Sequence, residues 1–261
     1  MAFTAHNLTV QENFQDFFEK WIVEQKEHLH ELISVSKSPN QTDSLVQNLV
    51  NRVLNHYKEY YTVKSNLAKD NAFVMLSPSW TTILEDGFLW IGGWRPTMAF
   101  HLLYSKSGLQ LEARLDELIR GIQTGDLGDL GPNQLTRVDR LQRKTIKEER
   151  EITEKMAKQQ ETVADSEMVE LSDVMTALME NDDAANGESV MNDQVDSAME
   201  RKEEGLVRVL GMADDLRLRT LKGVVEILSP KQALHFLIAA AELHLRMHDW
   251  GKQMDEKKTD G

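Results

Sequence analysis

The sequence predicts an all-α fold: a single-domain helical bundle with a long charged helix and a mobile acidic linker. Strong helix formers are plentiful, and only 5 of the 261 residues are proline. Apolar residues recur at helical spacing along most of the chain, and no stretch alternates with period 2 between hairpin turns. A chain of this length can bury one sizeable core, so we expect one domain.

Composition excludes several classes of protein. The formal net charge of −13 argues against an unaided grip on nucleic acid, because binding to phosphates requires a basic face. The absence of cysteine excludes disulfides, thiolate nucleophiles and cysteine-based zinc sites. No secretory signal pattern is visible, and no apolar run approaches the ~20 residues of a membrane span. We therefore expect a nuclear and/or cytoplasmic protein without membrane contact.

Two helices are expected first. After an N-terminal extension over residues 1–11, residues 12–35 carry a wide apolar stripe that includes Trp21. A polar linker containing Pro39 follows, and residues 43–69 resume helical spacing. The first stripe is typical of a core helix rather than of a cofactor site.

The stretch Ser79–Leu103 predicts two short apolar helices joined by a tight corner. Ser79 can cap the first helix, and Gly92 and Gly93 can end it, because glycine reaches the left-handed conformation common after a helix. Pro96 suits the first turn of the next helix, since it lacks a backbone donor and presets φ.

Trp90, Trp94 and Arg95 are the least generic residues of this corner. The two tryptophans lie four residues apart across it. Arg95 can pair with an acidic group such as Glu85 or Asp86, or stack on a tryptophan. We expect Arg95 to act as a structural clamp rather than as a ligand contact.

The next third of the chain is charged. A short helix over 109–122 and a glycine-rich loop precede a long, sparsely apolar helix over Leu135–Val163. This helix carries a basic cluster that acidic residues follow at once, which indicates a solvated face with i,i+4 charge pairs. The cluster comprises Arg137, Arg140, Arg143, Lys144 and Lys147. Residues 180–200 are acidic with little to bury, so they predict a mobile linker before helicity resumes near Met199.

The last helix has a strong start signal. Ser229 can be its N-cap, Pro230 its first residue and Gln232 the return arm of a capping box. The residues that follow are apolar on nearly every side, so this helix should be central to the bundle. Residues 253–261 are expected to be a frayed tail.

His244 and His248 lie four residues apart on the last helix, so both rings can project from one face, as two ligands of a metal or haem iron would. No HExxH pattern and no third ligand at a diagnostic spacing accompany them. Structural histidines near a helix C-terminus are the favoured interpretation, and a haem or metal site is the alternative. No cofactor is required by the sequence.

Several segments together resemble a plant family. They are residues 14–21 (FQDFFEKW), 85–97 (EDGFLWIGGWRPT), 213–217 (ADDLR) with Thr220-Leu221, and 228–233 (LSPKQA) leading to Trp250-Gly251. In this order they resemble the delay-of-germination (DOG) domain family, whose domain is shared with TGA-type bZIP transcription factors, and the resemblance covers residues 12–252. The signature residues are Trp21, Glu85, Trp90, Gly92, Gly93, Trp94, Arg95, Pro96, Asp215, Pro230 and Trp250.

The resemblance implies an all-α regulatory domain without enzymatic activity, which acts through protein contacts in seed dormancy, abscisic-acid signalling or transcriptional regulation. Implied partners are regulatory proteins such as protein phosphatases or transcription factors, and the chain can form a homo-oligomer. A bZIP protein needs a basic helix and a leucine zipper, and residues 1–13 contain neither, which argues against direct DNA binding. A haem or apolar-ligand sensor and a DNA-binding regulator are the two alternative functions.

Overall fold

The computed structural model describes residues 2–39, 42–114, 125–179 and 185–259, and no strand occurs among them. The predicted all-α fold is confirmed. The described helices are α1 (Ala2–Lys37), α2 (Asp43–Asp70), α3 (Ala72–Leu76), α4 (Ile83–Asp86), α5 (Met98–Ala113), α7 (Pro132–Glu161), α8 (Ser166–Met179), α9 (Ala185–Ile227) and α10 (Pro230–Thr259), with short 3₁₀ turns η1 (Leu127–Asp129) and η2 (Thr162–Ala164). Within this described part, no helix is long and apolar enough to cross a membrane.

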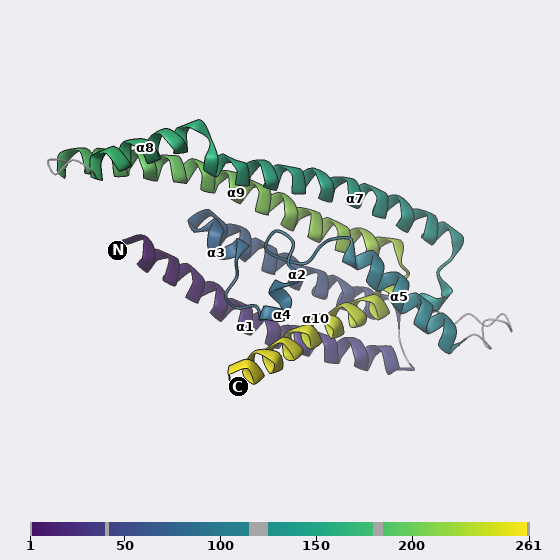
Figure 1. Cartoon of the computed structure of the whole chain (residues 1–261). Helices are drawn as coiled ribbons and strands as arrows, with labels where there is room; N and C mark the ends of the chain where they lie inside the picture. The colour runs from purple at the N-terminus through teal and green to yellow at the C-terminus, as the bar shows by residue number, and fades with distance from the viewer. Residues whose placement is uncertain (1, 40–41, 115–124, 180–184, 260–261) are drawn as a thin grey trace.

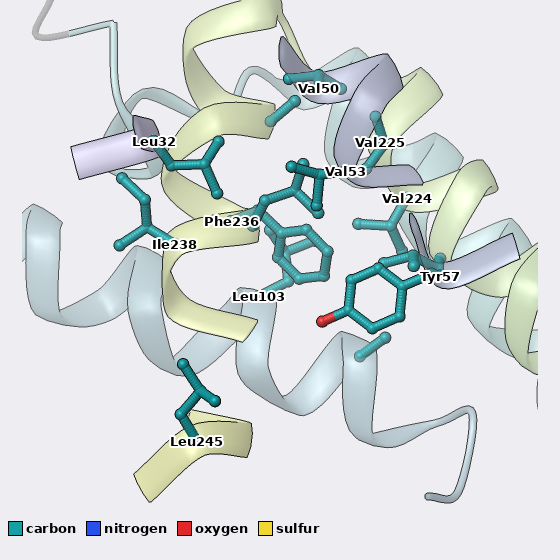
Figure 2. Close-up of a cluster of buried hydrophobic side chains, with 14 of the residues drawn as sticks. Leu32, Val50, Val53, Tyr57, Leu103, Val224, Val225, Phe236, Ile238 and Leu245 are labelled. Atoms are coloured by element: carbon teal, nitrogen blue, oxygen red, sulfur yellow. The ribbon is translucent and has the colours of Figure 1, made fainter. Parts of the chain in front are cut away.

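Helices α1, α2, α5, α9 and α10 enclose the main core. Helix α10 packs against α1, α2 and α5, while α2 also packs against α9 (Figure 1). Each of these five helices contributes a buried side chain to the cluster in Figure 2: Leu32, Val53, Leu103, Val224 and Phe236, in chain order. Burial of such large apolar side chains is worth about 1.5–3 kcal/mol each, so this cluster dominates the stability of the fold.

Helices α7 and α9 form a long antiparallel pair along one side of the core (Figure 1). Near the middle of α7, Arg219 binds Glu148 with 2.7 Å between nitrogen and oxygen, and near the end of α7 Gln159 donates to the Lys202 carbonyl at 2.9 Å. A smaller buried cluster around Ile152 lies between the two helices. The predicted long charged helix is therefore present as α7.

The predicted acidic linker differs from the structure. Residues 180–184 lie outside the described residues, but residues 185–200 form the first turns of α9 instead of a linker. Methionine, glutamate, glutamine and alanine are good helix formers, and α8 packs along this part of α9, so the absence of a core does not prevent a helix. Low burial was the wrong criterion for excluding helicity here.

Both ends of the expected domain also extend as helix. Helix α1 starts at Ala2, so the expected extension over residues 1–11 belongs to it, and Val10 is buried. Helix α10 continues to Thr259 through the expected tail. Its start is confirmed: Gln232 accepts a hydrogen bond from the Ser229 amide at 3.0 Å, and the Ser229 hydroxyl accepts one from the Gln232 amide at 3.3 Å.

The corner region is less helical than predicted. Helix α4 has only four residues, and its N-cap is Thr82 rather than Ser79. A run of turns leads from Gly87 to α5, which absorbs the first residues of the helix expected over 109–122, while residues 115–124 lie outside the described residues. The polypeptide at 88–97 has apolar residues at helical spacing, yet its carbonyl groups bind side chains of other helices, as described below.

Candidate functional site

A buried charged cluster lies under the Gly-Gly-Trp-Arg corner, and Arg217 of α9 is its centre. The Arg217 side chain is fully buried. Its guanidinium donates to the carbonyl oxygens of Trp94 at 2.7 Å and Ile91 at 3.0 Å, and also to that of Trp90. One arginine thus replaces the backbone hydrogen bonds that a helix would have provided, because its planar fork presents several donors at once.

Lys64 of α2 and Asp214 of α9 complete this corner cluster. The Lys64 ammonium donates to the Gly92 carbonyl at 2.6 Å and to Asp214 at 3.1 Å, and Arg217 also donates to Asp214. Burial lowers the pKa of Lys64 to about 8, although the Asp214 carboxylate opposes this shift. Two cations therefore share one carboxylate, and backbone carbonyls of the corner supply the remaining acceptors.

The two glycines of the corner are required because the backbone there lies very close to α3 and to the Arg217 side chain. Gly92 has φ +68°, and a Cβ placed on it would lie 2.5 Å from the Met75 carbonyl oxygen. A Cβ on Gly93 would lie 3.0 Å from the guanidinium carbon of Arg217. The backbone must come this close for its carbonyls to reach Arg217 and Lys64, which explains both glycines.

Helix α7 holds the corner from its other side through Glu149. This buried carboxylate accepts hydrogen bonds from the Thr97 amide at 2.6 Å, the Thr97 hydroxyl at 3.2 Å and Arg95 Nε at 3.0 Å. A carboxylate at the N-terminus of α5 also meets the favourable end of the helix dipole. The predicted clamp role of Arg95 has this geometric support, but its partner is Glu149 and not Glu85 or Asp86.

The two corner tryptophans bind different helices. Trp94 donates from Nε1 to the Tyr61 hydroxyl of α2 at 2.7 Å, and Trp90 donates to the Thr153 hydroxyl of α7 at 3.0 Å. The guanidinium carbons of Arg95 and Arg217 lie 5.9 and 5.3 Å from the Trp90 ring centroid, within cation–π range. The corner is thus braced to three helices by polar contacts.

The residues that bind the corner, Lys64, Asp214 and Arg217, were not among the predicted site residues. Asp215, named among the signature residues, is exposed and pairs with Arg219 at 2.6 Å, whereas its neighbour Asp214 is buried. A signal was available: Asp214 and Arg217 occupy the same helical stripe as buried Leu210 and Leu221. A charged residue in an apolar stripe marks a buried polar contact.

Glu85, His248 and Thr82 join α4 to α10. Glu85 accepts hydrogen bonds from the Thr82 amide at 2.9 Å, the Thr82 hydroxyl at 2.8 Å and His248 Nδ1 at 3.0 Å. Burial on its own raises the pKa of Glu85, but the hydrogen bonds from His248 and Thr82 outweigh it, and the net pKa is lowered. A Cβ at Gly251 would overlap the Thr82 hydroxyl, so α10 approaches α4 closely there.

The fold accounts for both histidines of the proposed haem or metal site. His248 is buried, is held by Glu85 and meets Phe18 edge-on at 5.6 Å between ring centroids. The His244 ring lies 5.5 Å from that of Trp21, and burial lowers its pKa. A porphyrin would have to displace these aromatic rings, so the arrangement fits a helix contact better than a haem pocket.

Among the described residues, no group of three or more His, Asp or Glu side chains is arranged to hold a metal ion. Haem binding stays an untested alternative.

The remaining predicted residues fall into two environments. Trp21 is buried, stacks on His56 at 4.5 Å between centroids and donates to the His56 carbonyl at 3.2 Å. Trp250, by contrast, is 50% exposed on the outer face of α10. Trp21 is therefore part of the core, and Trp250 is part of the surface.

Three residues of the basic cluster on α7 form ion pairs within the helix. Arg143 pairs with Asp139, and Lys144 and Lys147 lie 3.8 Å from the carboxylates of Glu148 and Glu151. These are i,i+4 pairs of the kind that the sequence predicted.

Comparison with known proteins identifies the family. A family model described as "Seed dormancy control" matches residues 28–105. Protein DOG1-like 3 of Arabidopsis thaliana is 31% identical over 99% of this chain and 90% of its own length. Protein RESPONSE TO ABA AND SALT 1 of the same plant is 28% identical over 93% of this chain and 96% of its own length. Transcription factor TGA2 is 28% identical over 87% of this chain but only 60% of its own length. The glycine–tryptophan corner and the buried charges that bind it thus belong to a chain that is a member of the DOG1-like family.

Proposed function

We propose that this chain is a non-enzymatic regulator that acts through protein–protein contacts in dormancy or abscisic-acid signalling, in the nucleus and/or cytoplasm. The family model described as "Seed dormancy control" and the relative named for its response to ABA and salt support the process. The buried charges support the absence of catalysis from this proposal, because Lys64 and Arg217 bind backbone carbonyls of the protein itself and Asp214 is enclosed between them. Such groups brace a fold and cannot reach a substrate.

The observation that carries the proposal is an apolar stripe on the outer face of α10. Leu243, Trp250 and Met254 are each between 41 and 50% exposed, and Met247 lies between them on the same face. Helical spacing puts the four side chains in one row. Tryptophan and methionine are enriched in the centres of protein interfaces. A row of exposed apolar side chains on one helix face is therefore typical of a surface that binds another protein.

Partners of this stripe are expected to be regulatory proteins such as protein phosphatases or transcription factors. Proximity labelling in plant cells tests this, because it reports partners and compartment together. The wild-type chain is compared with Trp250→Ser, and Val23→Ser on α1 is the matched control, since Val23 is also exposed.

We expect labelled regulatory proteins with the wild type and the control, and at least a tenfold loss of their labelling with Trp250→Ser, as for a central interface tryptophan. Recovery of no regulatory protein by the wild type would contradict the proposed function. Equal labelling by the wild type and both variants would show that the stripe on α10 does not bind these partners.

A further inference from the structure

Helix α8 carries many apolar side chains, and none of those that the structure describes is buried. Its described residues include Met168, Val169, Leu171, Val174 and Leu178, yet none of residues 166–178 is buried, and Val169 and Val174 are 51 and 43% exposed. A helix in a globular protein normally buries such residues against a core. Here α8 packs on α9 and the η2 turn, at the outer edge of the molecule (Figure 1).

A groove runs between α8 and the start of α9. It has a volume of about 430 Å³ and is lined by Leu171, Val174 and Met191 among polar residues. The two helices leave this groove open to water on one side, and a third helix packed along it would complete a small bundle. We refer to residues 165–178 and 191–204, which carry this groove, as the arm.

The arm is strongly acidic. It carries nine acidic and two basic side chains, and both basic side chains are already paired: Arg201 with Glu167, and Lys202 with Asp165 at 2.6 Å. Five carboxylates of the arm have no cationic partner among the described residues: Glu170, Asp173, Asp193, Asp196 and Glu200. Acidic side chains beside an apolar seam are complementary to one class of ligand, an amphipathic helix with basic flanks.

We propose that the arm binds a basic amphipathic helix of a partner protein, which lies in the groove as the third helix of a small bundle. Its apolar residues at i, i+3, i+4 and i+7 would cover Leu171, Val174 and Met191, and its lysines or arginines would meet the unpaired carboxylates. This inference rests on the proposed function as a protein-binding regulator. It makes the arm a second binding surface, distinct from the α10 stripe, and names the kind of partner that binds there.

The test uses the full chain and a synthetic peptide of about 20 residues, long enough for several helical turns, with leucine at i, i+3, i+4 and i+7 and lysine elsewhere. Fluorescence anisotropy measures its binding to the wild type, to Glu170→Lys and to Val174→Gln. Glu59→Lys on α2 is the matched control, because Glu59 is exposed and has the same charge. A scrambled peptide of equal composition controls for the overall charge of the chain.

We expect the ordered peptide to bind the wild type and Glu59→Lys alike, about fivefold to tenfold more weakly to the two groove variants, and more weakly with added salt. Hydrogen exchange should slow in residues 166–178 on binding. Equal affinity for the scrambled peptide, or for the groove variants, overturns the proposal. Self-association of the chain that Val174→Gln abolishes would also overturn it, by making a second copy the occupant. The proximity labelling that depends on Trp250 would persist if only the arm proposal failed, and it would be absent if the proposed function failed. The two failures are therefore distinguishable.

Discussion

Arg217 of α9 donates a hydrogen bond to the carbonyl oxygen of Trp94 at 2.7 Å, across 123 positions of sequence. This contact explains how a glycine-rich turn can lie inside a helical bundle. Backbone carbonyls without partners are costly to bury, and here a guanidinium and an ammonium satisfy those of Trp90, Ile91, Gly92 and Trp94. The corner is ordered by side chains from distant helices and not by its own propensity.

Replacement of Arg217 by methionine should strongly destabilise the fold. The substitution leaves the carbonyls of Trp90, Ile91 and Trp94 without this donor, and a broken buried ion pair typically costs about 3–5 kcal/mol. Urea unfolding measures the loss. Arg219→Met is the matched control, because Arg219 is half-exposed and its pairs with Asp215 and Glu148 are worth at most about 1 kcal/mol each. Equal losses for the two variants would contradict the role of Arg217.

Alanine at two glycines should have opposite effects. At Gly92 the new Cβ meets the Met75 carbonyl oxygen at 2.5 Å and φ is +68°, so we expect a loss of at least about 1–2 kcal/mol. At Gly211, inside α9, nothing lies within 4 Å of the new Cβ, and alanine should stabilise by about 0.5–1 kcal/mol. Thermal unfolding of the two variants gives the comparison. A neutral Gly92→Ala would mean that the corner can move away from α3.

The elements that could be predicted from the sequence are those with local signals. The capping box at Ser229 and the apolar stripe of α1 depend on neighbouring residues, and the structure has both. The start of α4 also has a local signal, the capping box of Thr82 and Glu85, which the prediction of Ser79 as the cap overlooked. The non-helical backbone that follows and the position of Arg95 depend on Glu149 and Arg217, which lie far along the chain, so no local pattern contains them. Lys64 could not be predicted for the same reason, because its partner Asp214 lies 150 positions away. Asp214 and Arg217, in contrast, have a local signal, since they lie in the apolar stripe of α9.

Replacement of Gly251 by alanine should separate α10 from α4. The Cβ would overlap the Thr82 hydroxyl, which belongs to the capping box that also holds Glu85 against His248. We expect a destabilisation of about 1–3 kcal/mol, typical of an overpacked contact. Combining it with Thr82→Ala tests the cause, because removal of the hydroxyl should make the second substitution less costly. Strict additivity of the two losses would show that the glycine is not required by this contact.

Acidification should weaken the fold through His56. This ring is buried between α1 and α2 and stacked on Trp21, and its Nε2 has no hydrogen-bond partner among the residues that the structure describes. Burial lowers its pKa to about 4, assisted by the neighbouring His28 and His244, although the backbone of Trp21 and the Glu24 carboxylate, 3.4 Å away, favour the charged ring.

The sign follows from proton binding. Between pH 4 and about 6.5 the unfolded chain holds more protons at this position than the folded chain, so stability is lost as the pH falls through this window. A pKa of about 4 in the folded chain against 6.5 in the unfolded chain corresponds to at most about 3.5 kcal/mol. Replacement of His56 by phenylalanine retains a ring against Trp21 and removes the titration, so the stability of this variant, measured by urea unfolding at a series of pH values, should depend less on pH. His30→Phe, at an exposed position of α1, should leave the wild-type slope unchanged. Equal slopes for His56→Phe and the wild type would assign the acid sensitivity to other groups, of which His28, His235 and His244 also have lowered pKa values.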